Sequence, residues 1–248
     1  MQDAGCRMQD VQCTMYDVRI TNNQQPITNS QQPITNSQQP ITSHGFRFSM
    51  YLCYMCMESI KTSIARVISL NESDWKIFSS HLKTRILAKH GHFLSEGQVC
   101  SSVAFVCSGT LVYYKLLKSG EEATTDFAFP GDWVTNNSSR LSQTPSRLNI
   151  KAIEDCELIT ISQADLEKCY LKIPSLERLG RILIEQAYVR IALQSIDLQT
   201  LSASQRYQKL LKEHPDIIQS IPLYHIASYL GIAPKSLSRI RREKIPVE

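Results

Sequence analysis

The regular apolar pattern of the chain begins near residue 57. From there to residue 69, isoleucine or valine occupies positions 60, 64, 67 and 68. Residues three or four apart share one face of a helix, so this spacing predicts a helix over residues 57–69. A cap signal at Asn71, followed by Trp75, Phe78 and Leu82 on one face, predicts a second helix directly afterwards.

Beyond about residue 87 the apolar residues come in short runs separated by glycines. Glycines stand at positions 97, 109, 120 and 131, at intervals of 11 or 12 residues. The runs are rich in β-branched and aromatic residues, and they occupy 103–106, 111–117, 124–129, 148–152 and 156–161. Short, evenly spaced strands with glycine turns are typical of an antiparallel sandwich or roll. The pattern therefore predicts an α+β chain with one of these two architectures at its centre and helix resuming near Asp165.

The segment 175–198 predicts one long helix that is apolar on more than one side. Ser175 follows Pro174 and is suited to cap the helix. A helix on the surface of a monomer needs an apolar face only about 100° wide. We therefore expect this helix to bury one face against the roll and the other against a second copy of the chain.

The last part of the chain predicts a helix over 204–213 and then two short helices joined by a tight turn. Residues 221–230 and 234–242 flank Gly231, which can adopt the positive φ that such a turn needs. Pro234 suits the first helical turn, where a missing N–H breaks no hydrogen bond. Leu237 and Ile240 face the preceding helix. The outer positions are Lys235, Ser236, Ser238, Arg239, Arg241 and Arg242.

Charge supports a polyanionic partner for this end of the chain. The 248 residues carry a net charge of +4, and residues 205–248 hold eight basic and four acidic side chains. The rest of the chain is balanced, so the whole excess lies in the C-terminal segment. A helix that is apolar inside and basic outside suits the major groove of double-stranded DNA.

The composition also bounds the cellular compartment. No apolar run approaches the roughly 18 residues that a membrane span needs. In the absence of a secretory signal, the eight cysteines indicate reduced thiols in a cytoplasmic protein rather than a disulfide framework.

The N-terminal segment 1–56 predicts a disordered leader. The heptapeptide QQPITNS occurs twice in tandem from Gln24 and restarts from Gln38, with one proline and one isoleucine in each copy. No core can form from one large apolar residue per repeat. Because Met57 opens the first patterned segment, we expect natural translation to begin at or near it.

Two metal-binding alternatives are open. Cys53 and Cys56 form a CxxC that, with Cys6 and Cys13, would supply four thiolates, although a single CxxC favours ordinary thiols. The second alternative is a cupin-like metalloenzyme built on an H-x-H-x3-E string.

The cupin string consists of His90, His92 and Glu96. Such a barrel also needs a histidine on a later strand, and residues 97–213 contain none. Exposed histidines at the start of a strand are the simpler interpretation. We therefore expect no metal, no cofactor and no enzymatic activity.

Together these segments resemble the Crp/Fnr family of transcription regulators. The matching stretches are FLSEGQV (93–99), FVCSGTLVYYKL (105–116), SGEE (119–122), PGDW (130–133), AIEDCELITIS (152–162) and LSRI (237–240). The resemblance spans about residues 57–242 and is closest to the short members of the Bacteroidetes type.

The resemblance implies a domain organisation. It places a cyclic-nucleotide-binding-like β-roll sensor domain at 57–174, a dimerisation helix at 175–200 and a helix-turn-helix domain at 201–248. Since the sequence ends six residues after Arg242, we expect the last domain to lack most of the β-wing of its relatives.

The resemblance also implies a function. It predicts a homodimeric, sequence-specific regulator that binds an inverted-repeat operator in double-stranded DNA. By the residue match, Pro234, Lys235 and Arg239 face the bases, with Arg239 suited to a guanine edge. Lys235 stands where relatives usually carry an acidic residue. RNA polymerase and a small-molecule effector of unknown identity are the further candidate partners.

Cyclic-nucleotide binders of this family hold the ribose with a Gly-Glu pair and the phosphate with an Arg-Ser pair. Counted from Gly131, these pairs fall on Thr135-Asn136 and Ser146-Arg147. Asn136 replaces the carboxylate, and the arginine comes one position late. We therefore expect a regulator that is not gated by cyclic AMP, with a cyclic-nucleotide-responsive factor as the alternative.

Overall fold

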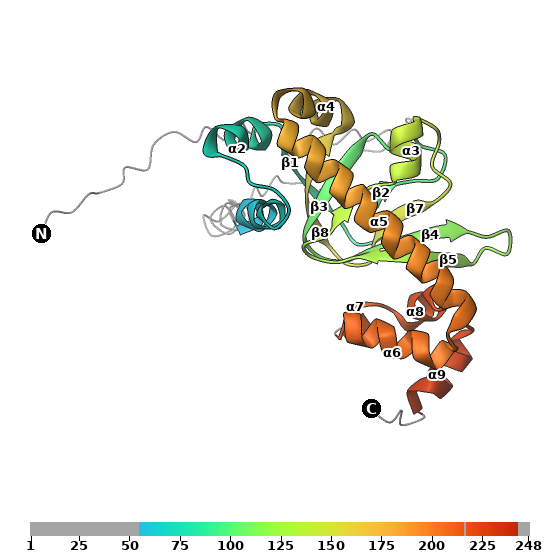
Figure 1. The fold of residues 1–248 in the computed structure, drawn as a ribbon. Helices are drawn as coiled ribbons and strands as arrows, with labels where there is room; N and C mark the ends of the chain where they lie inside the picture. The colour runs from blue at the N-terminus through green and yellow to red at the C-terminus, as the bar shows by residue number, and fades with distance from the viewer. Residues whose placement is uncertain (1–54, 216, 243–248) are drawn as a thin grey trace, which may run out of the picture. The chain divides into compact units, whose positions relative to one another are not determined.

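The computed structural model describes residues 55–215 and 217–242. Helices precede and follow a central pair of sheets, and a cluster of short helices ends the described chain (Figure 1). No helix in these described ranges is long and apolar enough to cross a membrane. Beyond a helix over 55–65, the helices are α2 (Glu72–Ser79), α3 (Asn137–Ser142), α4 (Gln163–Lys172), α5 (Pro174–Thr200), α6 (Ala203–Glu213), α7 (Ile217–Ser220), α8 (Leu223–Tyr229) and α9 (Pro234–Arg242).

The strands form the two antiparallel sheets of a β-roll. One sheet has the order β1-β8-β3-β6 and the other the order β2-β7-β4-β5. The fold class predicted from the sequence is thus confirmed. The strands are β1 (Lys83–Leu87), β2 (His92–Leu94), β3 (Ser102–Ser108), β4 (Leu111–Leu116), β5 (Glu122–Ala128), β6 (Trp133–Val134), β7 (Asn149–Ala152) and β8 (Cys156–Ser162).

Strand β3 shows how alternation divides the core. Ala104 and Val106 face the interior of the roll, whereas Phe105 between them faces the helices. All three side chains are fully buried. Gly109, at the turn to β4, has φ +80, and a Cβ there would lie 2.5 Å from the carbonyl oxygen of Asp155. The turn therefore requires a glycine.

The helix over 55–65 packs on the outer face of this sheet. Cys56 and Ile60 are buried in the cluster that also holds Phe105. Cys56 forms a disulfide with Cys107 of β3, with the two Cα atoms 5.4 Å apart. The expectation that all cysteines are reduced is wrong for this pair. The expected domain boundary between residues 56 and 57 lies inside this helix.

Three sequence predictions fall partly or wholly outside the described residues. The repeats and the other three cysteines of the CxxC alternative lie before residue 55, and the segment that would hold a wing lies after residue 242.

The sequence pattern also missed β1, whose five residues include only one buried side chain, Leu87. An edge strand with so little burial carries no apolar alternation to detect.

Helix α5 follows α4 directly and runs for 27 residues. Its first turns pack on the roll, where Leu176 and Leu179 are buried and Leu183 is partly buried. Its later turns leave large apolar side chains in solvent, including Tyr188 at 73% exposure and Ile191 at 60%. The apolar residues that the sequence shows on more than one side of this helix therefore have two environments. Those in the first turns pack on the roll, whereas those in the later turns are exposed.

The C-terminal helices share a core with strand β5. Buried side chains of α6, α7, α8 and α9 cluster with Val112, Tyr114 and Phe127 of the hairpin β4–β5. The ring of Tyr229 in α8 lies 5.1 Å from that of Phe127, centroid to centroid. Helix α8 is thereby held against the outer face of the second sheet.

Candidate nucleic-acid interface and ligand cassette

The turn between α8 and α9 has the backbone geometry that its sequence predicts. Gly231 has φ +68, in the left-handed region that glycine tolerates best. The amide of Gly231 donates to the carbonyl of Ser228, and the amide of Ile232 donates to that of Ala227, both at 3.0 Å. The last carbonyls of α8 are thereby satisfied, and the chain reverses sharply into α9.

Helix α9 buries its apolar side and exposes its basic side. Leu237 and Ile240 are 1% and 6% exposed, and both pack in the core shared with α8. Ser236 and Ser238 are partly buried, and Ser238 donates its hydroxyl to the carbonyl of Pro234 at 3.0 Å. Ser238 therefore serves the helix itself. The exposed residues are Pro234, Lys235, Arg239, Arg241 and Arg242.

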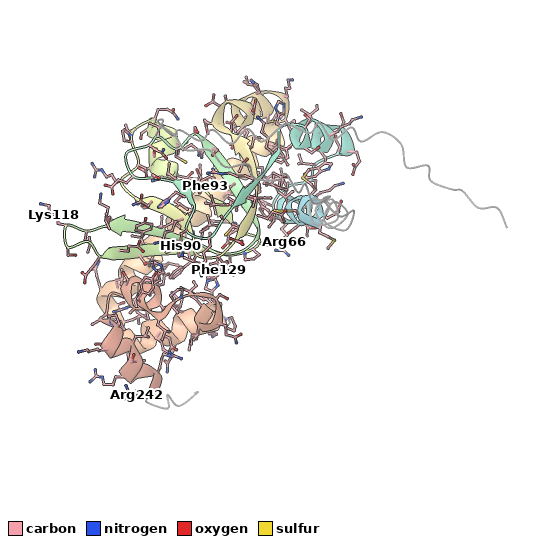
Figure 2. All side chains as sticks on the ribbon, turned by 180° about the vertical axis from the view of Figure 1, so that it is seen from behind. Arg66, His90, Phe93, Lys118, Phe129 and Arg242 are labelled. Atoms are coloured by element: carbon pink, nitrogen blue, oxygen red, sulfur yellow. A yellow bond between two sulfur atoms is a disulfide. The ribbon has the colours of Figure 1, made fainter. Side chains whose placement is uncertain are left out.

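Two arginines form hydrogen bonds that hold the α8–α9 helix pair against the rest of the protein. Neither contact was predicted from the sequence. Arg206 of α6 donates from Nε and Nη2 to the carbonyl of Leu230, at 3.2 and 2.8 Å. Arg241 donates to the hydroxyl of Tyr207, whose pKa is raised chiefly by burial. Arg241 thus contacts another side chain of the protein. Arg242 is the last residue of α9 (Figure 2).

Helix α8 is hydrogen-bonded to strand β5 of the roll. His225 is fully buried, and its Nδ1 lies 2.8 Å from Oγ1 of Thr124. Ser228, one turn later, accepts from the amide of Thr124 and donates to the carbonyl of Glu122. Burial lowers the pKa of His225 to about 4, and the nearby carboxylate of Glu122 offsets this only in part. The imidazole is therefore neutral at physiological pH.

The sequence predicts four ligand-pocket residues, Thr135, Asn136, Ser146 and Arg147, which we call the cassette. The first three lie together around the start of α3. Asn136 caps α3 and donates from Nδ2 to the hydroxyl of Ser146 at 2.8 Å. Ser146 is buried and donates in turn to the carbonyl of Leu148. Thr135 donates to the carbonyl of Ser102 at 3.0 Å. Arg147, in contrast, is exposed.

A tyrosine occupies the space beside this cassette. Tyr113 of β4 is bonded through its hydroxyl to the backbone of Thr135, and burial raises its pKa well above the usual range. Tyr113 also packs against the interior cluster of the roll. Asn136 and Ser146 are thus bonded to each other, and Thr135 and Tyr113 both line a cavity of about 560 Å³ beside α5.

The comparisons with known proteins agree with this architecture. Residues 84–172 match the family described as the cyclic nucleotide-binding domain. Three solved structures resemble most of the chain. The chain has the Crp/Fnr fold. No curated protein matches the sequence.

The first of these structures is FixK2 from Bradyrhizobium japonicum, with 21% identity, a TM-score of 0.59, and coverage of 65% of this chain and 83% of that one. The second is a putative Crp/Fnr-family transcriptional regulator from Eubacterium rectale, with 22% identity, a TM-score of 0.55, and coverage of 70% and 82%. The third is the c-di-GMP-responsive regulator CLP from Xanthomonas campestris, with 14% identity, a TM-score of 0.53, and coverage of 70% and 91%.

The cyclic nucleotide-binding domain of this chain differs from the pattern that binds the nucleotide. Asn136 provides an amide where the family pattern has a carboxylate, and that amide already bonds Ser146. Arg147 is exposed.

The residues of the cupin alternative serve other contacts. The Nε2 atom of His92 lies 2.9 Å from the hydroxyl of Tyr114, and Glu96 forms an ion pair with Lys115. His90 occupies a turn with φ +67. Among residues 55–215 and 217–242, no group of three or more histidine, cysteine, aspartate or glutamate side chains is arranged to hold a metal ion.

Proposed function

We propose that the protein is a sequence-specific DNA-binding transcription regulator that acts as a homodimer. The observation that carries this proposal is α9, whose buried side fixes it on α8 while Lys235, Arg239 and Arg242 are exposed. A helix held in this way can enter the major groove with its cations toward bases and phosphates. The Crp/Fnr fold supports the same assignment.

The exposed part of α5 supports dimerisation. Tyr188, Ile191 and Ile196 are 73%, 60% and 54% exposed, although a soluble surface rarely groups large apolar side chains in this way. A second copy of α5 would cover them through a symmetric contact. Two-fold symmetry then places two α9 helices in successive major grooves, about 34 Å apart, on an inverted repeat.

The cassette supports control by something other than cyclic AMP. Its amide and hydroxyl groups bond each other, and the expected phosphate-binding arginine, Arg147, is exposed. RNA polymerase and a small-molecule effector complete the proposed partners. Cytoplasmic location is part of the same proposal, since transcription regulators work where the chromosome is.

The test of this proposal is a selection of bound duplexes from random DNA, followed by titration of variants. We expect the selected sites to be inverted repeats. Arg239→Ala should weaken binding to the selected site by about 1–3 kcal/mol per half-site and relax preference at one base pair. Arg178→Ala, which removes an exposed cation from α5, is the matched control. Equal weakening of selected and random DNA by Arg239→Ala would make Arg239 a phosphate contact.

A further inference from the structure

The helix over 55–65 is attached to the β-roll by a narrow apolar stripe and by one covalent bond. The stripe provides one buried side chain in each turn, and it packs against Phe105 of β3. Its members are Cys56, Ile60, Ile64 and Ile68. Isolated helices shorter than about 12–15 residues are marginal in water. The position and the stability of this helix therefore depend on its attachment to the sheet.

The covalent bond joins Cys56, in the first turn of the helix, to Cys107, near the end of β3. The two Cα atoms are 5.4 Å apart, a separation that a disulfide spans without movement of the backbone. The two cysteines are 51 residues apart in the sequence. While the bond exists, the N-terminal end of the helix cannot leave the sheet.

The other cysteines that the structure describes are not placed for the same chemistry. Cys100, Cys156 and Cys169 are buried and free. Burial raises the pKa of the Cys156 thiol to about 11, and it also raises the pKa of the Cys169 thiol. Buried thiols with a raised pKa are seldom thiolates and are inert in exchange. Cys107, in contrast, is only partly buried.

The setting of this disulfide favours a reversible bond over a permanent one, and this step rests on the proposed function. A transcription regulator works beside the chromosome, in a compartment where thiol buffers keep most cysteines reduced. Disulfides found there are usually transient and redox-sensing. A free cysteine packs as a small apolar side chain. Cys56 and Cys107 can therefore stay in the cluster of Ile60 and Phe105 after the bond is reduced.

We propose that Cys56 and Cys107 form a reversible redox site that exchanges with low-molecular-weight thiols and their disulfides. In oxidation, the thiolate of Cys107, the more exposed of the two, attacks a small disulfide, forms a mixed disulfide and releases one small thiolate. The thiolate of Cys56 then attacks the sulfur of Cys107, and the second small thiolate leaves. Two protein thiols thereby pass two electrons and two protons to one small disulfide, which becomes two thiols.

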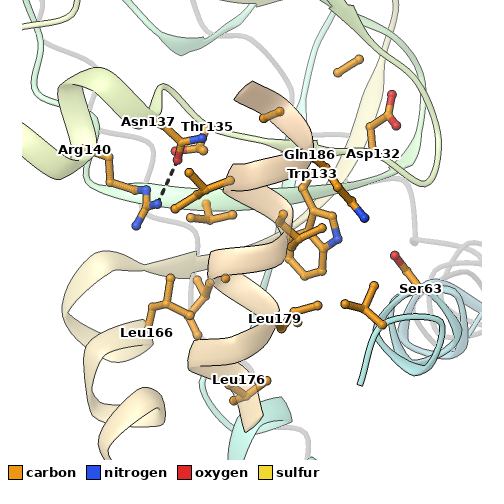
Figure 3. Close-up of a pocket in the computed structure, with 18 of the residues that line it drawn as sticks. Ser63, Asp132, Trp133, Thr135, Asn137, Arg140, Leu166, Leu176, Leu179 and Gln186 are labelled. Atoms are coloured by element: carbon orange, nitrogen blue, oxygen red, sulfur yellow. Dashed lines mark hydrogen bonds between the residues drawn. The ribbon is translucent and has the colours of Figure 1, made fainter. Parts of the chain in front are cut away.

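The state of this site determines how firmly the base of α5 is covered. Ser63 of the helix and Leu179 of α5 line the same cavity (Figure 3). Ile60 also shares a buried cluster with Leu176 and Leu179. With the disulfide formed, the helix is tied to β3, whereas the reduced helix can open locally. The oxidised form is therefore the more rigid one at this end of α5.

The test is equilibration of the full-length protein, without DNA, in glutathione buffers with an increasing ratio of oxidised to reduced glutathione. Alkylation of free thiols and mass spectrometry of peptides report the bond between Cys56 and Cys107. We expect one transition from dithiol to disulfide while reduced glutathione is still in excess. Hydrogen exchange of the amides in residues 55–65 should slow by about tenfold or more across this transition.

Three variants assign the transition to this pair. Cys107→Ala should abolish it and leave the fast hydrogen exchange of the reduced form at every glutathione ratio. Cys56→Ala removes the same bond from the side of the helix, so it gives the same answer if Cys107→Ala does not fold. Cys53→Ser is the matched control, because it removes the other cysteine of the CxxC and should titrate as the wild type does.

Four outcomes would overturn the proposal. The bond persists when all the glutathione is reduced, which would make it a permanent structural disulfide. The bond does not form at the most oxidising ratio. Cys53→Ser removes the transition. Hydrogen exchange of residues 55–65 is the same in both states. Because none of these measurements uses DNA, selection of an inverted repeat by the same protein would show that the proposed function holds even if this site fails.

Discussion

The Nδ1 atom of His225 and the Oγ1 atom of Thr124 lie 2.8 Å apart and join the helix-turn-helix to the β-roll. Their separation in sequence is 101 residues. On the other side of the ring, Nε2 is buried, has no hydrogen bond to the part of the chain that the structure describes, and lies 3.8 Å from Oε2 of Glu122. Lys151, which pairs with Glu122, limits how far that carboxylate can favour a charged imidazole.

This contact predicts an acid-sensitive junction. The folded pKa of His225 is lowered from 6.5 to about 4, so between these values the unfolded chain binds a proton that the folded chain does not. Stability therefore falls as the pH drops from 6.5 toward 4, by about 3 kcal/mol in full. His225→Asn, which can still bond Thr124, should flatten the dependence of melting temperature on pH across this interval. An unchanged profile in the variant would contradict the assignment, and the exposed His90→Asn is the control.

The exposed apolar face of α5 predicts where a charged substitution would separate the two subunits of the dimer. Ile191→Glu should give monomers in sedimentation at roughly 10 micromolar, because the dimer would bury an unpaired carboxylate twice. Leu171→Glu changes an 88% exposed residue of α4 and should leave the dimer intact. Leu183 is unsuitable for this test, since it packs on the core of its own subunit. Dimeric Ile191→Glu would place the interface elsewhere.

We expect Arg242, which is exposed at the end of α9, to contact a DNA phosphate whatever the base sequence. Arg242→Ala should weaken binding to selected and random duplexes alike and reduce the slope of log affinity against log salt by about 0.9 per site. The measurement is a titration at several salt concentrations. Arg241→Ala should additionally lower the melting temperature, because Arg241 also bonds Tyr207. A change confined to the selected duplex would mean that Arg242 reads a base.

The hydrogen bond between Asn136 and Ser146 predicts that cyclic nucleotides do not bind. Calorimetry of the wild type with cyclic AMP and cyclic GMP should show no heat of binding at millimolar ligand, since Asn136 and Ser146 satisfy each other. Arg147→Ala should change nothing, because that side chain is exposed. Micromolar binding that Arg147→Ala removes would restore the cyclic-nucleotide-responsive alternative.

The N-terminal segment predicts two different outcomes for two truncations. Deletion of residues 1–54 should leave melting temperature and DNA binding unchanged, since the repeats cannot build a core. Deletion of residues 1–60 also removes Cys56 and Ile60, which are 6% and 0% exposed. Loss of the buried isoleucine alone should cost about 2–5 kcal/mol. Equal stability of the two forms, measured by denaturation under reducing conditions, would contradict this account.

Local sequence signals were enough for the β-roll and the helix pair. Glycines 97, 109, 120 and 131 all adopt positive φ, and the strands between them follow the apolar runs. The same holds for the turn at Gly231 and for the division of α9 into apolar and basic sides. These features depend on backbone freedom and on periodicity, which neighbouring residues set by themselves.

The sequence also identified the cassette positions, but not the hydrogen bonds or the exposure of their side chains. Counting from Gly131 located Asn136 and Ser146, yet only the structure shows that they bond each other while Arg147 is exposed. A count along the chain cannot tell which way a side chain turns after a loop, because one residue of slack reverses its face.

The sequence by itself determined the order of most elements, the basic C-terminal helix and the excess of apolar residues along α5. Only the tertiary structure decided which of those residues face the subunit's own core, that Cys56 meets Cys107, that His225 is buried against Thr124, and that Nε of Arg140 is buried with no hydrogen-bond partner among the described residues. The physical reason is distance along the chain. Periodicity records the environment within a few residues, whereas burial and pairing depend on segments that only folding brings together.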